Sequence, residues 1–303
     1  MEPLDIISQI QKAFPSLEVR RDEPLDRHCS FRIGGPARAM LLPASAEELA
    51  SLCVFLRQRG ERPFLLGNGT NVLFPDRGLD RLVVKTCRNV GALSVSGTRL
   101  TAECGATLAS AASAARDAGL TGLEFAHGIP GSVGGGVVMN AGAYGGELKD
   151  VVAETEYLDE NMEIHTLRGG EHRFSYRHSV LSERGGVALR CVFALTTGDR
   201  DAITARMREL MEKRRASQPL DMPSAGSTFK RPAGGFAAAL IDEAGLKGCS
   251  VGGAQVSEKH AGFVVNTGGA SCADVLRLME HIQKTVLARS GVELEPEVRV
   301  IGE

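Results

Sequence analysis

One stretch of the chain, residues 122–146, limits the folds open to it because it concentrates glycine. Nine of the 36 glycines lie here, and Glu124 and His127 are its only potentially charged residues. Glycine is costly to order, and it is kept where the backbone needs positive φ or where another group closely approaches its N–H groups. An anionic ligand fits this composition. The alternative is a surface loop without function, but such loops are rarely so apolar.

Two loops suit a phosphate held by backbone N–H groups. In the first, residues 131–133 (GSV) predict a turn that leads into a short buried helix over residues 134–139. The N-terminal N–H groups of that helix would face the phosphate. In the second, residues 67–71 (GNGTN) follow an apolar strand predicted at residues 63–66. Taken alone, the second loop has a plain hairpin turn as its alternative.

The second loop matches neither common nucleotide-binding motif. Val72 stands where a dinucleotide-binding fingerprint has its third glycine, and no helix is predicted after it. The G-x-x-x-x-G-K-[ST] motif does not occur in the sequence. A phosphate at this loop would therefore be held by backbone N–H groups, with help from the side chains of Thr70 and Asn71.

Composition excludes several classes of protein. The chain has 303 residues, of which 43% are hydrophobic and 24% charged, with a net charge of −2, which is typical of a globular protein with two or three domains. Acidic and basic residues are interleaved, so neither nucleic acid nor a membrane surface is expected as a partner. No apolar run approaches the roughly 20 residues that span a bilayer, and residues 1–5 do not resemble a signal peptide. We therefore expect a cytoplasmic location.

The seven cysteines are scattered, and no two form a C-x-x-C pair. An odd number without paired spacing favours reduced, mostly buried thiols over disulfides or metal ligands. No metal site is expected.

Hydrophobic periodicity and turn residues predict an α+β chain. Ser45 and Glu48 are spaced as a capping box, and Gly119 would close the alanine-rich helix before it. Residues 223–232 are small and polar enough to predict an irregular loop, and a domain boundary is expected near Thr197. The predicted helices are 4–14, 45–60, 107–117, 134–139, 199–215, 237–244 and 271–289. The predicted strands are 37–42, 63–66, 72–74, several short segments within 81–104, then 151–158, 163–167, 187–195, 262–266 and 298–300.

A set of short motifs runs in order along nearly the whole chain. They are residues 31–36 (FRIGGP), 66–71 (LGNGTN), 128–135 (GIPGSVGG), 140–145 (NAGAYG), 176–177 (YR), 226–227 (GS) with 229–230 (FK), 253–257 (GAQVS) with His260, and 295–298 (EPEV). Together these motifs resemble the UDP-N-acetylenolpyruvoylglucosamine reductase family. The combination is far more specific than any single motif.

The resemblance implies a fold, a reaction and a set of cofactors. The fold would be an FAD-binding region of the vanillyl-alcohol-oxidase type in two subdomains, residues 1–85 and 86–197, followed by a C-terminal α/β substrate-binding domain, residues 198–303. The enzyme would use NADPH and noncovalent FAD to reduce the enolpyruvyl group of UDP-N-acetylenolpyruvoylglucosamine to UDP-N-acetylmuramate for peptidoglycan synthesis. The short chain resembles the subclass without a tyrosine-bearing loop. Thr70 stands where serine is usual and Gly262 where asparagine is common, and a monomer is expected.

The resemblance also assigns roles to individual residues. Without it, Arg177 would be interpreted as a surface cation, Ser227 as a turn hydroxyl and Glu297 as a solvated acid. With it, these three are the expected catalytic residues, with Ser227 as proton donor. The expected substrate contacts are Tyr176, Lys230, Gln255 and Asn266. The expected cofactor contacts are Arg32, Gly67, Asn68, Gly69, Thr70, Asn71, Gly128, Ile129, Gly131, Ser132, Gly134, Gly135, Asn140 and Gly142.

Two other functions remain open. An FAD oxidase of the same fold would use oxygen, but it would have no reason to keep Ser227 and Glu297 in their motifs. A flavin-binding module without catalysis would have no use for a separate C-terminal domain. His28 and His127 are possible sites of covalent flavin attachment, but the family implies noncovalent FAD, so both are expected to be structural.

Overall fold

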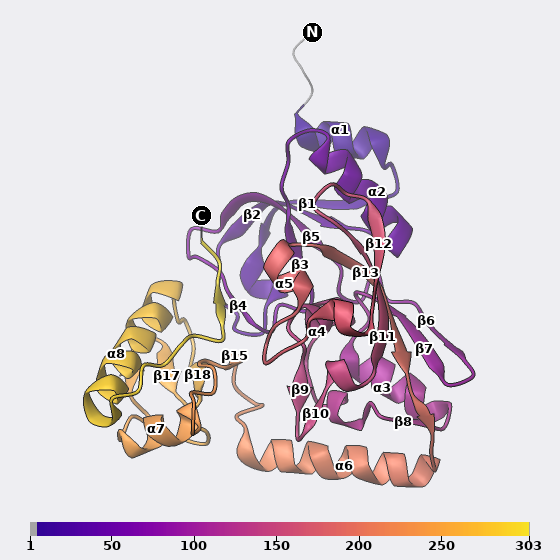
Figure 1. Ribbon diagram of the computed structural model, residues 1–303. Helices are drawn as coiled ribbons and strands as arrows, with labels where there is room; N and C mark the ends of the chain where they lie inside the picture. Colours follow the sequence, from indigo (N-terminus) through magenta and orange to yellow (C-terminus); the bar gives the residue numbers. More distant parts are fainter. Residues whose placement is uncertain (1–4, 303) are drawn as a thin grey trace. The chain divides into compact units, whose positions relative to one another are not determined.

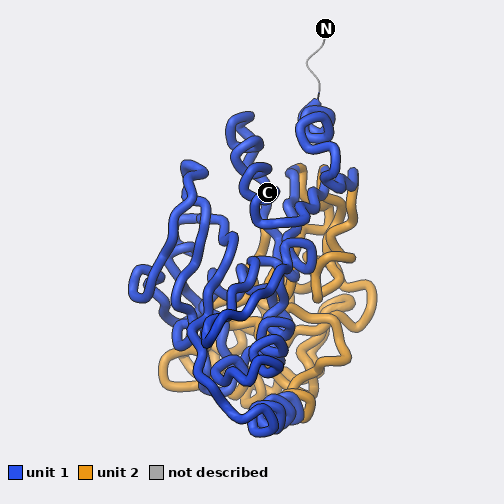
Figure 2. Tube along the Cα trace, turned by 90° about the vertical axis from the view of Figure 1, so that its right-hand side faces the viewer, with its two compact units in different colours: residues 1–21, 39–68, 81–213 blue, residues 22–38, 69–80, 214–303 orange. Residues whose placement is uncertain are grey.

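A computed structural model describes residues 5–302, which divide into two compact units (Figure 2). Unit 1 comprises residues 5–21, 39–68 and 81–213, and unit 2 comprises residues 22–38, 69–80 and 214–302. Each unit is therefore assembled from segments that are distant in sequence. The continuous domain limits expected at residues 85 and 197 stay predictions.

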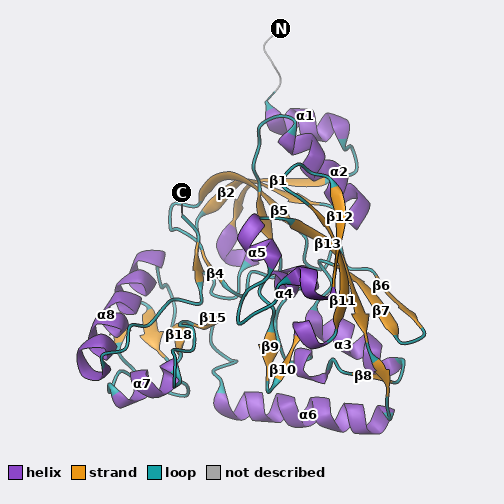
Figure 3. Cartoon of the chain, in the orientation of Figure 1, coloured by secondary structure: helices purple, strands orange, loops and turns teal. Residues whose placement is uncertain are grey.

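Two β-sheets form the framework of unit 1 (Figure 3). One has the strand order β1-β2-β5-β3, with β3 parallel to β5. The other is antiparallel, with the order β12-β11-β13-β7-β6. The strands of the two sheets are β1 (Glu18–Pro24), β2 (Pro36–Leu42), β3 (Phe64–Leu66), β5 (Leu79–Lys85), β6 (Leu93–Ser96), β7 (Arg99–Glu103), β11 (Val152–Leu158), β12 (Ile164–Arg168) and β13 (Val187–Ala194). The short pairs are β9 (Gly142–Ala143) with β10 (Gly146–Glu147), and β8 (Leu120–Thr121) with β14 (Thr196–Thr197).

Helices cover these sheets and close two hydrophobic cores. Helices α1 and α2 contribute Ile10 and Leu49, both fully buried, to one core. Helices α3 and α4 contribute Leu108 and Val137 to the other, and α4 lies against β13 and β7. The helices are α1 (Ile6–Ala13), α2 (Ala46–Arg57), α3 (Leu108–Asp117), α4 (Val133–Val138), α5 (Val180–Arg184) and α6 (Arg200–Ser217), with 3-10 turns η2 (Glu124–Ala126), η3 (Leu148–Asp150) and η4 (Gly169–His172).

Unit 2 is built on a four-stranded antiparallel sheet of order β15-β18-β17-β16. Helix α8 packs on β16 and β17 and touches α7 (Figure 1). Strand β4 pairs in parallel with β19, which joins segment 69–80 to the end of the chain. The elements are η1 (Leu25–His28), β4 (Val72–Leu73), β15 (Ser224–Ser227), α7 (Ala237–Glu243), β16 (Ser250–Val251), β17 (Ala254–Val256), β18 (Phe263–Asn266), α8 (Cys272–Ser290) and β19 (Arg299–Val300).

The structure confirms the predicted helices and strands to within a few residues, although residue 4 of the first helix lies outside the described part. The capping box at α2 is only half formed. Ser45 Oγ accepts from Glu48 N, but Glu48 Oε2 accepts from Ala44 N, one residue too early. All seven cysteines are free and six are buried, as expected.

The prediction of an irregular loop at residues 223–232 is wrong in its first half, because β15 occupies Ser224–Ser227. Small residues have weak strand propensity, and β18 supplies the apolar strand that β15 pairs with. The pairing is interrupted at Gly226, whose φ is +78°. None of the helices within residues 5–302 is long and apolar enough to cross a membrane.

Candidate active site

The two predicted phosphate loops meet within unit 1 at residues 67–68 and 130–132. The Asn68 side chain donates from Nδ2 to Pro130 O at 2.6 Å. A Cβ atom on Gly67 would lie 2.4 Å from Ser132 Oγ, so only glycine allows this approach. Asn68 Oδ1 also accepts from Cys87 Sγ at 3.2 Å. The loop after β3 and the turn before α4 therefore form one continuous backbone surface.

Four backbone N–H groups on this surface donate no hydrogen bond within the described residues. They belong to Gly67, Asn68, Gly131 and Ser132. A partly buried N–H group without an acceptor costs free energy comparable to a lost hydrogen bond. Such groups are retained where a ligand supplies the acceptor, and the pyrophosphate of FAD is an acceptor of this kind. The residues present therefore fit FAD.

The prediction that the first N–H groups of α4 face a phosphate is wrong. Val133 N donates to Ala106 O at 2.8 Å, Gly134 N donates to Cys104 O at 2.8 Å, and the Gly135 N–H bonds to Ser132 Oγ at 3.4 Å. These groups are used to dock the helix on the segment before α3. The unpaired N–H groups lie one and two residues earlier, in the turn itself.

Several of the expected cofactor residues have a structural reason for their identity. A Cβ on Gly134 would lie 2.8 Å from Cys104 Cβ, so this glycine allows α4 to pack closely. A Cβ on Gly142 would lie 2.7 Å from Gly146 O across the β9–β10 hairpin. Ile129 N donates to Ala126 O at 3.0 Å, and Gly128 precedes it in the same turn. Direct cofactor contacts by these residues stay predictions.

Asn140 lies in unit 1 after α4, and the remaining expected cofactor residues lie in unit 2. Gly69 has φ +64°, and a Cβ there would lie 2.2 Å from His28 O. Asn71 O accepts from Arg299 N at 3.1 Å, while Thr70 beside it is half-buried. Arg32 is exposed, with φ at 55°, a conformation that is uncommon for a residue with a side chain and that gathers at functional sites.

Arg177 lies in a tight turn between η4 and α5. Ser175 and His178 exchange two backbone hydrogen bonds at 3.1 and 3.2 Å across the turn. Arg177 has φ at 53°, as the third residue of a type II turn requires, although glycine is usual there. Its guanidinium carbon lies 5.1 Å from the centre of the exposed Tyr176 ring.

In unit 2, the segments that carry Ser227 and Glu297 are hydrogen-bonded to each other. Glu297 N donates to Thr228 O at 2.8 Å, and Lys230 N donates to Glu295 O at 2.8 Å. The Lys230 ammonium forms an ion pair with Glu295. Ser227 is exposed and Glu297 is half-buried. The two hydrogen-bonded segments therefore carry an alcohol, a carboxyl group and a cation.

The expected substrate residues Gln255 and Asn266 make contacts within unit 2. Gln255 Nε2 donates to Gly248 O at 3.3 Å and to Ser250 Oγ at 3.1 Å. Asn266 is buried, and its Nδ2 donates to Phe31 O at 3.1 Å while its Oδ1 accepts from two backbone N–H groups. Asn266 therefore holds the turn before Arg32, and contact with substrate by either residue stays a prediction.

The two histidines considered for flavin attachment differ in their surroundings. His28 Nε2 lies 2.6 Å from Glu23 Oε1, and its side chain is 8% exposed. His127 has a buried Nδ1 with no hydrogen-bond partner among the described residues. Burial lowers the pKa of His127, and the charge of Arg116 adds to this. Both are consistent with structural roles.

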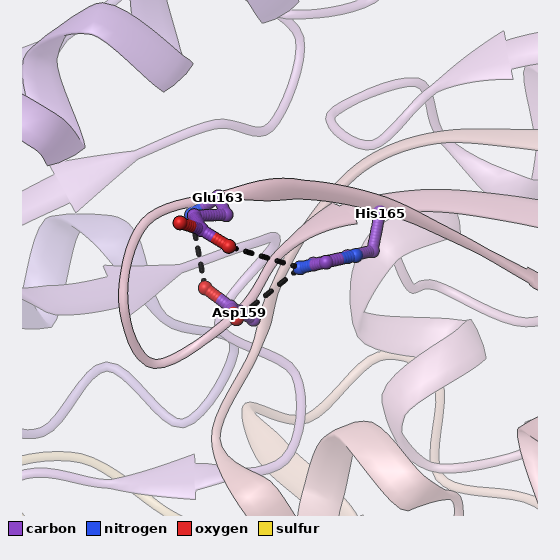
Figure 4. Close-up of side chains that lie close together, drawn as sticks. All are labelled: Asp159, Glu163 and His165. Atoms are coloured by element: carbon purple, nitrogen blue, oxygen red, sulfur yellow. Dashed lines mark hydrogen bonds and ion pairs between the residues drawn. The ribbon is translucent and has the colours of Figure 1, made fainter.

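Asp159, Glu163 and His165 cluster at the turn between β11 and β12 (Figure 4). Asp159 Oδ1 accepts from Glu163 N at 2.9 Å, and His165 Nε2 lies 3.3 Å from Asp159 Oδ2. Exposed clusters of this kind arise from the turn itself, because an aspartate at its start accepts the backbone N–H groups that follow.

Comparison with known proteins decides the family. Residues 37–168 match the FAD binding domain family, and residues 218–301 match the family described as UDP-N-acetylenolpyruvoylglucosamine reductase, C-terminal domain. The UDP-N-acetylenolpyruvoylglucosamine reductase of Caldanaerobacter subterraneus is 49% identical over 300 residues, 98% of each chain. The chain belongs to the UDP-N-acetylenolpyruvoylglucosamine reductase family. The reductase of Limosilactobacillus reuteri is 45% identical over 98% of this chain and 99% of its own.

The fold class predicted from the sequence is confirmed. The crystal structure of the UDP-N-acetylenolpyruvylglucosamine reductase of Thermus caldophilus aligns with a TM-score of 0.81 at 34% identity, over 94% of this chain and 99% of that one. An alkyldihydroxyacetonephosphate synthase aligns with 65% of this chain at 15% identity and a TM-score of 0.50, which shows a shared fold alone.

Sequence analysis missed two residues beside Arg177 in this family member. Ser179 Oγ donates to Val138 O at 2.8 Å, across 41 residues of sequence. Glu147 Oε2 accepts from Asn140 Nδ2 at 2.9 Å and lies 2.8 Å from Lys149 Nζ. A lone serine and a lone glutamate carry no periodic signal, so neither contact was open to single-sequence reasoning.

Proposed function

We propose that this protein reduces the enolpyruvyl group of UDP-N-acetylenolpyruvoylglucosamine with NADPH, forming UDP-N-acetylmuramate for peptidoglycan synthesis. The observation that carries the proposal is 49% identity over nearly the whole chain to a reductase of that name. The four unpaired N–H groups of the glycine loops give independent support for the cofactor.

Noncovalent FAD is held by the backbone of Gly67, Asn68, Gly131 and Ser132, with Arg32 and residues 69–71 as further proposed contacts. When bound, FAD supplies hydride-transfer chemistry between NADPH and the vinyl carbon of the substrate. The turn before α4 contributes no side-chain charge, so the pyrophosphate meets only N–H dipoles there. Substitutions that introduce a negative charge into this turn should therefore weaken the binding of FAD.

Three side chains serve the second half of the reaction. Addition of hydride to the terminal vinyl carbon develops enolate charge on the substrate carboxylate, which needs fixed positive or hydrogen-bonding groups. Arg177 supplies the positive charge and Glu297 a hydrogen bond. Ser227 Oγ gives its proton to the neighbouring carbon, so that one hydride and one proton complete the reduction. Tyr176, Lys230 and Gln255 are proposed to contact the nucleotide sugar.

Anaerobic stopped-flow tests the function. The yellow holoenzyme should lose its absorbance near 450 nm on mixing with NADPH, then regain it on mixing with the enolpyruvyl sugar. No loss of absorbance would indicate a flavin-binding module without catalysis. Reoxidation by oxygen but not by the sugar would indicate an oxidase.

The Ser227→Ala variant tests the proton donor. Removing a positioned general acid costs about 10²–10⁴-fold, so reoxidation by the sugar should slow by this factor while reduction by NADPH keeps its rate. Ser227→Cys should restore part of the activity, since a thiol also donates a proton. Equal slowing of both half-reactions would mean that Ser227 is structural.

We also propose that the enzyme is cytoplasmic, because both NADPH and the nucleotide sugar are soluble small molecules, and that it is a monomer. Sedimentation velocity across a tenfold range of concentration should give one species of the 32.1 kDa chain. A concentration-dependent shift to larger species would contradict this.

A further inference from the structure

The turn that carries Arg177 is tied at both ends to the chain around the C-terminus of α4. At its start, Ser175 O accepts from Asn140 Nδ2 at 3.0 Å. At its end, Ser179 Oγ donates to Val138 O at 2.8 Å. Both tying side chains are almost fully buried, with Asn140 1% and Ser179 0% exposed.

Both N–H groups of the Asn140 side chain, and its oxygen, are bonded within unit 1. Its two N–H groups bond to Ser175 O and to Glu147 Oε2, and its Oδ1 accepts from Lys149 N at 2.9 Å. A buried amide with these three bonds fixes the segments it joins, because breaking any bond leaves a buried group unsatisfied. The side chain therefore has a structural role, and the expected contact of Asn140 with the cofactor stays a prediction.

The backbone at both sites is in an unusual conformation. Asn140 has φ at 43° and Arg177 has φ at 53°, each in the left-handed region. Such conformations cost roughly 1–3 kcal/mol and persist when surrounding contacts determine them. The two ties add to the backbone hydrogen bonds between Ser175 and His178 that close this turn. Glu147 adds an electrostatic link, since Lys149, Asn140 and then Arg177 lower the pKa of its carboxyl group.

We propose that Asn140 and Ser179 are positioning residues that clamp the Arg177 turn to the end of α4, the helix that begins at the cofactor turn. The clamp fixes the guanidinium where the substrate carboxylate must meet it. The inference rests on the proposed function, because it takes Arg177 to contact that carboxylate.

The Ser179→Ala variant removes one tie with little change in volume. In the holoenzyme, reoxidation by the enolpyruvyl sugar should slow about tenfold to a hundredfold, as misplacement of a catalytic group by about 1 Å does. FAD content and reduction by NADPH should not change. Ser110→Ala is the matched control, because Ser110 Oγ also donates to a backbone carbonyl, Thr107 O at 2.7 Å, but in α3, away from the Arg177 turn.

A double-mutant cycle separates positioning from general stabilisation. In an Arg177→Ala background, Ser179→Ala should have no further effect on reoxidation, since the group that it positions is gone. Additive losses in the cycle would overturn the proposal. The proposed function fails separately, if wild type is not reoxidised by the sugar or if Arg177→Ala reoxidises at the wild-type rate.

Asn140→Asp supplies a second test with a pH readout. The new carboxylate would face two acceptors, Ser175 O and Glu147, and could donate to neither. The rate at which the variant is reoxidised by the sugar, relative to wild type, should therefore be low at pH 8. The ratio should recover towards pH 5, because a protonated aspartate regains one donor. A ratio that does not vary with pH, in a variant that keeps its FAD and melting temperature, would overturn the assignment to Asn140.

Discussion

At the scale of single residues, the glycines of the 122–146 stretch serve two different purposes. Around Gly131 there is room, since a Cβ atom would meet Leu108 Cδ1 at 3.5 Å and Ile129 Cγ2 at 3.9 Å, both ordinary contacts. Around Gly134 there is none, because Cys104 lies too close. The first glycine keeps the backbone open to a ligand, and the second lets a helix pack.

Gly131→Asp should fold but lose FAD. A Cβ atom makes only ordinary contacts there, but the negative charge would stand beside the N–H groups of Gly131 and Ser132, which we propose bind the pyrophosphate. We expect at least a tenfold rise in the Kd for FAD, measured by flavin fluorescence. Gly131→Asn is the matched control of the same size without charge, and it should bind more tightly than the aspartate variant. Equal affinity in the two variants would refute the electrostatic explanation.

Gly134→Ala should show the opposite pattern. Its Cβ would lie 2.8 Å from Cys104 Cβ in a close-packed core, and overpacking of this kind costs about 1–3 kcal/mol in free energy of unfolding. The N–H groups proposed to bind FAD are untouched, so the folded fraction should bind FAD with nearly wild-type affinity. Gly170→Ala, where no atom lies within 4 Å, is the control and should leave the free energy of unfolding nearly unchanged.

At the scale of elements, one helix start is capped from outside its own segment. Asp76 accepts from Cys272 N at 2.6 Å and from Ala273 N at 3.2 Å, while Ser271 and Asp274 form a capping box at the same end of α8. The first N–H groups of α8 are thus satisfied by the protein. The start of α8 differs in this respect from the turn before α4, where the Gly131 and Ser132 N–H groups have no acceptor within the described residues.

Asp76→Ala should lower the free energy of unfolding by about 1 kcal/mol, as loss of a capping side chain does. Asp76 is exposed, so the substitution leaves no cavity in the core. Asp80→Ala, an exposed acid in the next strand, is the control and should have a smaller effect. Urea denaturation followed by circular dichroism measures both, and equal losses would show that the cap contributes nothing.

Elements with a strong local signal were predictable from sequence, whereas those made by a distant partner were not. Ser132, Thr107 and Ser271 cap their helices through contacts three residues away, which spacing alone reveals. Strand β15 depends on pairing with β18, nearly 40 residues later.

In the candidate site, too, features with a local signal were predictable and features set by distant partners were not. The glycine loops were predictable, but the N–H groups without an acceptor among the described residues lie one and two residues before the start of α4 rather than within it, because the first N–H groups of α4 have acceptors on the segment before α3.

At the scale of the whole molecule, three histidines make the folded state sensitive to mild acid. Burial lowers the pKa of His127, His172 and His260 below the ordinary value of 6.5. His172 is the clearest case, since it is 0% exposed and both ring nitrogens are bonded, Nδ1 to Gly169 O and Nε2 to Thr155 Oγ1, each at 2.9 Å. Because a carbonyl only accepts, Nδ1 carries a proton, and burial disfavours a second proton on the ring.

The free energy of unfolding should therefore fall as pH drops below 6.5. The unfolded imidazoles protonate near that pH while the folded ones protonate only at lower pH, so the unfolded state binds more protons and gains stability relative to the folded state. Above pH 6.5 the contribution is complete, and for His172 the slope below it reaches at most about 1.4 kcal/mol per pH unit. Urea titrations between pH 5 and 7.5 measure this slope while carboxyl groups remain ionised. His172→Gln keeps a donor and an acceptor but does not titrate, so its slope should be shallower than that of wild type. Identical slopes in the two proteins would show that His172 protonates as readily when folded as when unfolded.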